Sequence, residues 1–199
     1  MRPIVAFQGE TGAFSEAAAE QLVPEPITLL PCATFEDTVR AVVNGHADYA
    51  VVPIRNVTAG PVHEGLDALA RYASLETLGE LSLPVRFAIM GLPGATVNAV
   101  TEVLSHPMAL KQVTRFLAAH PHITPVEAYD TAGAARMVAI RRDPAAVAIA
   151  ARWAAAHYGL VILEEGLEDR PDNATTFVLV RRRRMEFDQL PTTEAKPAL

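Results

Sequence analysis

Short apolar runs alternate with alanine-rich segments of helical period along almost the whole chain. This alternation is typical of an α/β protein, in which each strand is followed by a helix that covers the sheet. The pattern predicts strands at 4–7, 28–30, 49–52, 85–90, 99–104, 124–127, 147–149 and 174–180. It predicts helices at 15–22, 35–44, 61–72, 107–119, 131–141 and 150–158.

The predicted elements form two similar β-α-β-α-β runs, which indicates two lobes. We expect residues 1–78 with 165–185 to form the first lobe and residues 79–164 to form the second. The chain would then cross between the lobes twice. Because open α/β sheets bind ligands at the carboxyl ends of their strands, we expect an inter-lobe cleft. Residues 186–199 contain few large apolar side chains and are expected to form a disordered tail.

The composition narrows the classes of function. With 199 residues, of which 50% are hydrophobic and 20% charged, the chain can build one sizeable core or two small lobes. A net charge of -6 argues against broad electrostatic binding to nucleic acid. No apolar run approaches the roughly 20 residues that span a bilayer, so no membrane partner is expected.

Cysteine usage and the N-terminal pattern favour a cytoplasmic protein. Cys32 is the only cysteine, which excludes an intrachain disulfide and argues against a cysteine zinc site. The N-terminal residues enter a strand pattern directly, without the apolar core and cleavage site of a secretory signal.

Polar residues gather where predicted strands end in the first lobe. Residues 9–15 follow the first strand, with glycines that permit a tight turn and with Ser15 placed to cap the next helix. Backbone N–H groups in such a turn can bind an anion. After the third strand stand Arg55 and Asn56, a guanidinium that can pair with a carboxylate and an amide that both donates and accepts hydrogen bonds.

The second lobe repeats this arrangement. Ser105 or His106 can cap the helix that begins near residue 107, and Gln112 is expected about one and a half turns into that helix. Asp130 or Thr131 can cap the following helix. Each junction alone is typical of a helix cap, whereas the set fits a small anionic or polyhydroxylated ligand held between the lobes. No Ser-His-Asp order, histidine pair with metal spacing or phosphate-binding loop stands out.

An ordered set of segments resembles prephenate dehydratases. The segments are 5–18, 52–56, 60–67, 104–107, 148–150 and 158–160, and the match covers nearly residues 3–183. Residues 173–177 also resemble the family signature Asn-x-Thr-Arg-Phe, with Thr176 in place of the arginine. The resemblance implies a two-lobed α/β fold like that of type II periplasmic binding proteins. It further implies conversion of prephenate to phenylpyruvate with loss of carbon dioxide and water, on the route to phenylalanine.

The resemblance also implies which residues form the site. The catalytic residues carried over are Thr175, Asn56, Ser105 and Gln112, with Thr175 assisting departure of the hydroxide. The substrate-binding candidates are Arg55, Ser15, His106, Thr131, Ala132, Thr176 and Phe177. No metal or organic cofactor is expected, and the only ligand expected is a small molecule. A homodimer or homotetramer is also implied.

Three positions depart from the family pattern. Thr176 replaces the arginine, Arg55 replaces an acidic residue before Asn56, and Val57 replaces a small hydroxyl residue. One hypothesis is that the guanidinium lost from the returning strand is replaced by Arg55 on a neighbouring strand. The alternatives are a prephenate decarboxylase-like enzyme without aromatisation and a non-catalytic protein that binds an aromatic metabolite.

Many relatives continue into a C-terminal ACT-type domain that binds phenylalanine. After Arg184 about fifteen residues remain, 185–199, too few for another domain. We therefore expect neither that module nor feedback inhibition through it in this chain.

Overall fold

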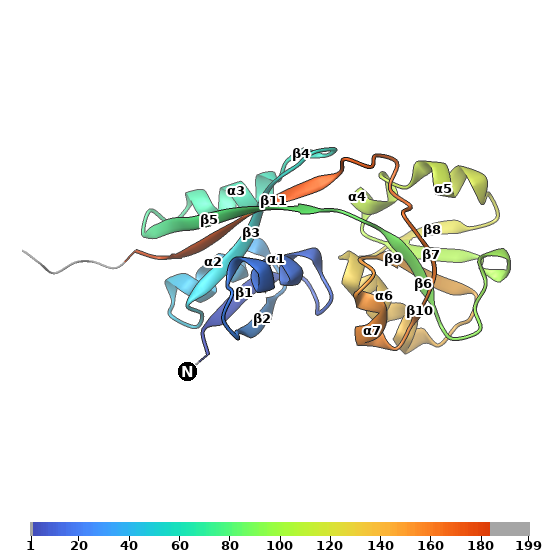
Figure 1. The fold of residues 1–199 in the computed structure, drawn as a ribbon, viewed down its shortest axis with the longest axis horizontal. Helices are drawn as coiled ribbons and strands as arrows, with labels where there is room; N and C mark the ends of the chain where they lie inside the picture. Colours follow the sequence, from blue (N-terminus) through green and yellow to red (C-terminus); the bar gives the residue numbers. More distant parts are fainter. Residues whose placement is uncertain (1, 184–199) are drawn as a thin grey trace, which may run out of the picture.

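Two mixed β-sheets, each covered by helices, make up residues 2–183 in the computed structural model (Figure 1). The predicted α/β class is confirmed. The predicted tail, 186–199, lies outside the described residues.

The first sheet has the order β2-β1-β3-β11-β5, and a short strand, β4, pairs with β3. Its strands are β1 (Ile4–Gln8), β2 (Thr28–Cys32), β3 (Tyr49–Asn56), β4 (Gly60–Pro61), β5 (Leu75–Pro84) and β11 (Ala174–Arg182). Its helices are α1 (Phe14–Leu22), α2 (Phe35–Val43) and α3 (His63–Ala70). β1, β2 and β3 are parallel, while β11 runs antiparallel to both of its neighbours.

The second sheet has the order β10-β6-β9-β7-β8. Its strands are β6 (Ala88–Gly91), β7 (Glu102–Ser105), β8 (Thr124–Glu127), β9 (Ala146–Ala150) and β10 (Val161–Glu165). Its helices are a short 3-10 turn η1 (Val97–Ala99), α4 (Pro107–Leu110), α5 (Thr114–Ala119), α6 (Thr131–Arg141) and α7 (Ala154–Tyr158).

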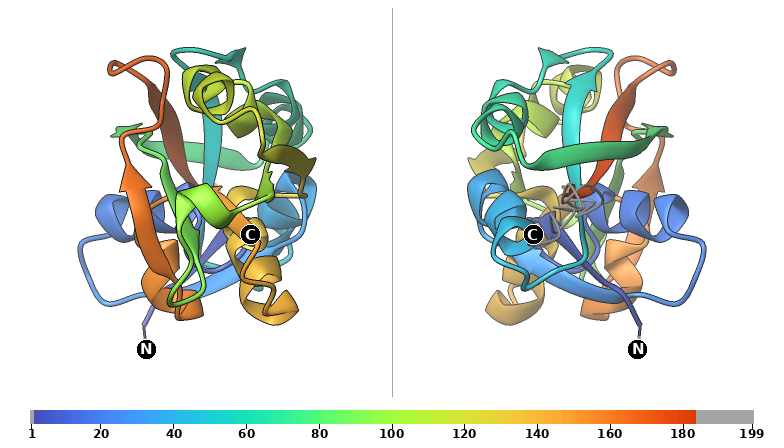
Figure 2. Two further views of the ribbon diagram at one scale, coloured as in Figure 1. Left: turned by 90° about the vertical axis from the view of Figure 1, so that its right-hand side faces the viewer. Right: turned by 90° about the vertical axis from the view of Figure 1, so that its left-hand side faces the viewer.

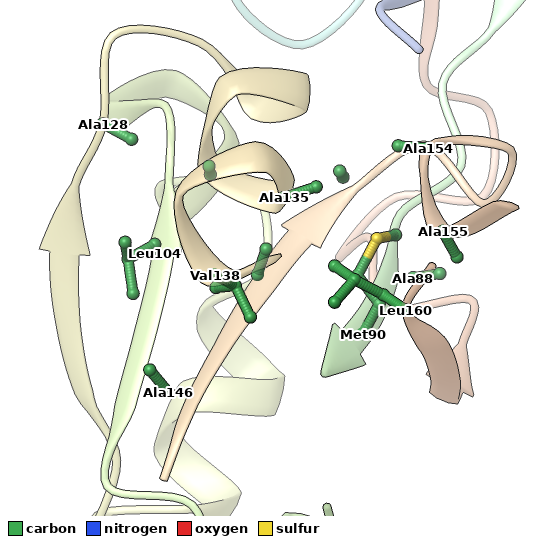
Figure 3. Close-up of a cluster of buried hydrophobic side chains, with 13 residues drawn as sticks. Ala88, Met90, Leu104, Ala128, Ala135, Val138, Ala146, Ala154, Ala155 and Leu160 are labelled. Atoms are coloured by element: carbon green, nitrogen blue, oxygen red, sulfur yellow. The ribbon is translucent and has the colours of Figure 1, made fainter. Parts of the chain in front are cut away.

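Strand alternation explains how each sheet buries both faces. In β3, Val51 packs on the α1 side of the sheet and Val52 packs on the side of α2 and α3. The end-on view of the first lobe shows α1 on one side and α2 with α3 on the other (Figure 2). In the second lobe, Leu104 of β7 and Val138 of α6 belong to one buried cluster (Figure 3). Each lobe therefore has cores of its own.

Three strands were not predicted: the two-residue β4 and the longer edge strands β5 and β10. Residues 75–84 form the ten-residue edge strand β5, which pairs with β11. Residues 161–165 form β10, the edge strand beside β6. β5 and β10 carry many exposed positions, so their sequences lack the continuous apolar run that indicates a buried strand.

The single helix predicted at 107–119 is wrong, because the chain breaks between α4 and α5. Val113, just before α5, has φ -126° and ψ 34°, outside helical geometry. The new helix start is capped from a distant segment, since the Asp169 carboxylate accepts from the N–H groups of Thr114 (2.8 Å) and Arg115 (2.9 Å). Gln112 therefore lies in a turn instead of inside a helix.

The lobes are joined by two connections, residues 85–87 and 166–173, that are held to each other. The Val85 N–H donates to the Asn173 carbonyl at 2.9 Å. Glu168 is buried, and its Oε2 accepts from the Phe87 N–H at 3.0 Å while its Oε1 lies 3.3 Å from the Arg86 Nε. Each of these contacts joins one connection to the other.

Asp169→Ala is expected to lower the free energy of unfolding at pH 7 by about 1–2 kcal/mol, the usual cost of a lost helix cap. Burial raises the pKa of Asp169, but hydrogen bonds from Arg115 and Thr114 outweigh it, so the net pKa lies below the ordinary value of 3.8. The cap's contribution is therefore present above pH 3.8 and is lost as the pH falls through the lower folded value.

Urea unfolding of wild type and variant between about pH 7 and pH 3 measures this, and the difference should narrow only at the acid end. Asp172→Ala is the matched control, because that side chain is exposed and pairs with Arg170 at the surface. A pH-independent difference for Asp169→Ala would contradict the prediction.

Candidate active site

A cavity of about 700 Å³ lies between the lobes and is lined from both. The first lobe contributes the turn after β1, the end of β3 and the start of α3, while the second contributes the starts of α4 and α6. Its lining includes Gln8, Gly9, Phe14, Ser15, Thr34, Asn56, His63, Glu64, Val85, Phe87, His106, Met108, Gln112, Tyr129, Asp130, Thr131 and Thr175. The predicted inter-lobe cleft is therefore present.

Asn56 and Thr175 meet on neighbouring strands at one edge of this cavity. They are register partners in the antiparallel β3–β11 pair, which places their side chains on the same face of the sheet. Asn56 Nδ2 donates to Thr175 Oγ at 2.9 Å. Asn56 Oδ1 accepts from the N–H groups of Thr58 (2.9 Å) and Ala59 (2.8 Å), so its amide is held on both sides.

Asn173 extends this network into the second lobe. Its side chain is 1% exposed, and its Oδ1 accepts from Asn56 Nδ2 at 3.1 Å. Its Nδ2 donates to Gln112 Oε1 at 2.7 Å, across the two lobes. Asn173 stands two residues before Thr175 in the signature. The sequence pattern did not indicate which residues its side chain would contact.

Six of the predicted site residues line the cavity: Ser15, Asn56, His106, Gln112, Thr131 and Thr175. The other five do not. Ser105 is fully buried and donates to the Ile149 carbonyl at 2.6 Å. Phe177 is 2% exposed and packs in the core of the first lobe, while Ala132 is fully buried against Phe7.

The helix caps differ in part from expectation. The predicted Ser15 cap is wrong, because α1 begins at Phe14 and Ser15 is inside the helix. No side chain caps this helix, and Glu16 within it accepts from the Gly12 N–H, one residue before the N-cap Ala13, at 2.8 Å. His106 caps α4 through its Nδ1, and Asp130 caps α6 by accepting from the Gly133 N–H.

Arg55 and Thr176 are register partners on β3 and β11, as Asn56 and Thr175 are. Since side chains alternate along a strand, the pair faces the opposite side of the sheet from Asn56 and Thr175. Arg55 is exposed, and neither residue is part of the cavity lining. A guanidinium at position 55 thus lies beside position 176, on the same face of the sheet.

The model of the prephenate dehydratase family matches residues 5–185. The chain belongs to this family. An arogenate dehydratase from Arabidopsis thaliana is 41% identical over 179 residues, which are 89% of this chain and 42% of that protein. A bifunctional N-acyl-homoserine lactone acylase/prephenate dehydratase from Komagataeibacter europaeus is 39% identical over 180 residues, 90% of this chain and 63% of that protein. The chain thus spans about two-fifths of the length of the plant relatives.

A solved structure extends this similarity to the fold. Prephenate dehydratase from Arthrobacter aurescens, in complex with L-Phe, superposes with a TM-score of 0.84 and 32% identity, covering 92% of this chain and 61% of that one.

Asp130 caps α6 and also lines the cavity, and the sequence did not indicate this second role. Its Oδ1 serves the α6 cap, while its Oδ2 is buried and has no hydrogen-bond partner within residues 2–183. Burial raises the pKa of this carboxyl, the Gly133 N–H opposes the rise, and the nearby Glu10 charge adds to it. A neutral or cationic ligand group beside Asp130 is therefore favoured over an anionic one.

Glu10 of the first lobe contacts Tyr129 and Arg136 of the second lobe, and we call these three residues the clasp. The Tyr129 hydroxyl donates to Glu10 Oε1 at 2.9 Å, and the Arg136 guanidinium lies 3.6 Å from the same oxygen. Nearby, the Tyr158 hydroxyl donates to the Thr11 carbonyl at 2.7 Å. Burial, together with the Glu10 and Asp130 charges, raises the pKa of Tyr158 to about 12, so this hydroxyl remains a donor at neutral pH.

Aromatic rings pack between the lobes near the clasp. Phe14 of the first lobe lies edge-on to Trp153 of the second, with ring centroids 5.5 Å apart, and edge-on to Phe87 of a connection at 5.8 Å. Trp153 is the only tryptophan in the chain. Its fluorescence therefore reports on the contact between the lobes.

The cavity lining carries carboxylates but neither lysine nor arginine among the described residues. Glu64 and Asp130 supply the carboxylates, and His63 and His106 are the basic side chains. Within residues 2–183 no group of three or more His, Cys, Asp and Glu side chains is arranged to hold a metal ion. The same residues contain no helix long and apolar enough to cross a membrane.

Glu10→Ala is expected to lower the free energy of unfolding by about 1 kcal/mol, since it removes the acceptor shared by Tyr129 and Arg136. The emission of Trp153 should move to longer wavelength as the lobes separate and water reaches the indole. Urea unfolding and fluorescence spectra measure both effects. Glu20→Ala, an exposed change on α1, is the control, and a Glu10→Ala variant indistinguishable from it would show that the clasp does not hold the lobes together.

Proposed function

We propose that this protein is a prephenate dehydratase, converting prephenate to phenylpyruvate, carbon dioxide and water in phenylalanine biosynthesis. The observation that supports this most is the placement of Thr175 on the cavity, bonded to Asn56 and linked through Asn173 to Gln112 of the other lobe. A small ligand between the lobes would meet neutral hydrogen-bond donors from both sides. Family membership gives these donors their proposed chemistry.

The chemistry of prephenate needs little from the protein beyond orientation and help for the leaving group. The bond to the ring carboxylate breaks to release carbon dioxide, and its electron pair enters the ring. The carbon–oxygen bond at the para position then breaks, and the departing hydroxide takes one proton to become water. The ring becomes aromatic, so much of the driving force lies in the substrate.

Thr175 is the proposed donor to the departing oxygen. A threonine hydroxyl is too weak an acid to release its proton readily, so hydrogen bonding or relay of a proton is its expected contribution. Because Asn56 already donates to Thr175 Oγ, the hydroxyl hydrogen is left to point elsewhere. We propose that it points to the substrate.

Arogenate, which carries an ammonium group where prephenate has a keto oxygen, is the second substrate to test. Several relatives at about two-fifths identity bear the name arogenate dehydratase. The buried Asp130 carboxyl and Glu64 in the cavity lining would favour a substrate with a positive charge. Decarboxylation without aromatisation and binding without turnover are the alternative functions.

We also propose a cytoplasmic location, because a single cysteine is typical of a protein that works in a reducing compartment. We also propose that it forms a homodimer or homotetramer. Sedimentation of the purified protein measures the assembly.

Incubation of the purified protein with prephenate at neutral pH should yield phenylpyruvate, identified by mass spectrometry against a blank without protein. Thr175→Val, which keeps the shape but removes the hydroxyl, should lower kcat about 100-fold or more. The same incubation is repeated with arogenate, and the kcat/KM values for the two substrates are compared. A non-aromatic decarboxylated product would favour the prephenate decarboxylase-like enzyme, and bound but unchanged substrate would favour a binding protein.

Arg55→Ala is expected to weaken binding of prephenate about two- to threefold at low salt, and this difference in affinity should shrink at high salt. The reason is that the Arg55 guanidinium is exposed and outside the lining, so salt screens its attraction for an anionic ligand. Titration of Trp153 fluorescence at low and high salt measures the dissociation constant. Arg183→Ala is the control, since it removes another exposed arginine from the first lobe. Wild-type affinity in Arg55→Ala would refute the hypothesis that Arg55 replaces the missing signature arginine.

A further inference from the structure

Asn173 is almost fully buried and lies outside the cavity lining, yet it contacts Asn56 and Gln112, which line the cavity from the two lobes. It stands at the end of the connection from β10 to β11. The two polar atoms of its amide have different partners. Oδ1 accepts from Asn56 Nδ2 and Thr58 Oγ, each at 3.1 Å, whereas Nδ2 donates to Gln112 Oε1.

The direction of these hydrogen bonds is set by the backbone. The N–H groups of Thr58 and Ala59 can only donate, so the group of Asn56 that faces them must be its oxygen. Asn56 therefore turns its Nδ2 toward Asn173. Asn173 must therefore accept this hydrogen bond with its Oδ1, which leaves its NH₂ facing Gln112.

The same logic continues to the cavity. Gln112 receives an N–H from Asn173, so its oxygen is occupied and its NH₂ is left for the cavity that the residue lines. Thr175 Oγ receives the shortest of the three contacts made by Asn56 Nδ2, at 2.9 Å, so its hydroxyl hydrogen is likewise left for the cavity. Two donors, one from each lobe, are thus presented to an acceptor in the ligand.

We infer that Asn173 is a positioning residue that sets the polarity of this chain of hydrogen bonds, so that Gln112 presents its NH₂ and not its oxygen to the substrate. This inference rests on the proposed function for its kinetic consequences. Asn173 itself touches no substrate. Carboxylates and a departing hydroxide are acceptors, and an inverted Gln112 would present them with a repelling oxygen.

Asn173→Asp tests the inference, because it keeps the shape but removes the donor. The introduced carboxylate would accept from Asn56 as before, and Gln112 would have to invert to donate to it. We expect kcat at neutral pH to fall about 10- to 100-fold. A buried carboxyl becomes protonated more readily than an exposed one, and the protonated side chain can again donate to Gln112. The ratio of variant kcat to wild-type kcat should therefore rise as the pH falls, after subtraction of the rate without protein.

Thr58→Val is the matched control. It removes the other side-chain donor to Asn173 Oδ1 but leaves the Thr58 N–H and the link to Gln112, so kcat should stay at the wild-type value. Far-ultraviolet circular dichroism and urea unfolding establish that both variants fold. Wild-type kcat in a folded Asn173→Asp variant would overturn the inference, as would a loss of kcat that is equal at every pH.

A measurement without turnover separates this inference from the proposed function. In protein labelled with ¹⁵N-glutamine, the Gln112 NH₂ hydrogens should exchange rapidly with water in the wild type and slowly in Asn173→Asp at neutral pH. Acid should restore rapid exchange relative to the wild type. Slow exchange in the wild type would overturn the inference, whereas absence of turnover on prephenate and arogenate with the expected exchange would overturn the proposed function alone.

Discussion

The antiparallel pairing of β11 with β3 is the contact on which the cavity depends, because β11 brings the chain back from the second lobe. Its register sets Thr175 opposite Asn56 and Thr176 opposite Arg55. The pleat then separates the two pairs, placing amide and hydroxyl on one face and guanidinium on the other. A shift of the register by one residue would exchange the faces and remove Thr175 from the cavity.

The lobes are coupled by polar contacts on several sides of the cavity as well as by the covalent connections. Glu168 and Asp169 brace one connection against the other and against the start of α5. Glu10 joins the turn after β1 to α6 from the opposite lobe. The hydrogen bond between Asn173 and Gln112 is buried, where an unpaired amide is costly, so this contact favours one relative position of the lobes.

The cavity lining offers a ligand neutral donors and carboxylates, without a lysine or arginine among the described residues to pair with an anion. Its lining offers hydroxyls, amides and histidines, with carboxylates at Glu64 and Asp130. A neutral donor costs less to bury than an unpaired cation and still stabilises developing negative charge when it is held in place. The lining therefore presents neutral donors to a ligand, and the Arg55 guanidinium lies outside it.

The sequence by itself determined the α/β class, most helices and strands, and the polar residues at the carboxyl ends of β1 and β3, because apolar periodicity and helix caps are local properties. The position of Asn56 at a strand end indicated the cavity before any family was considered, whereas the role of Thr175 came from the family resemblance. The tertiary structure decided what local pattern does not encode. It broke the helix at Gln112 because Asp169, more than fifty residues away, caps a new start. It gave Asn173 its contacts because hydrogen-bond partners from two lobes meet only after the chain has crossed between them twice.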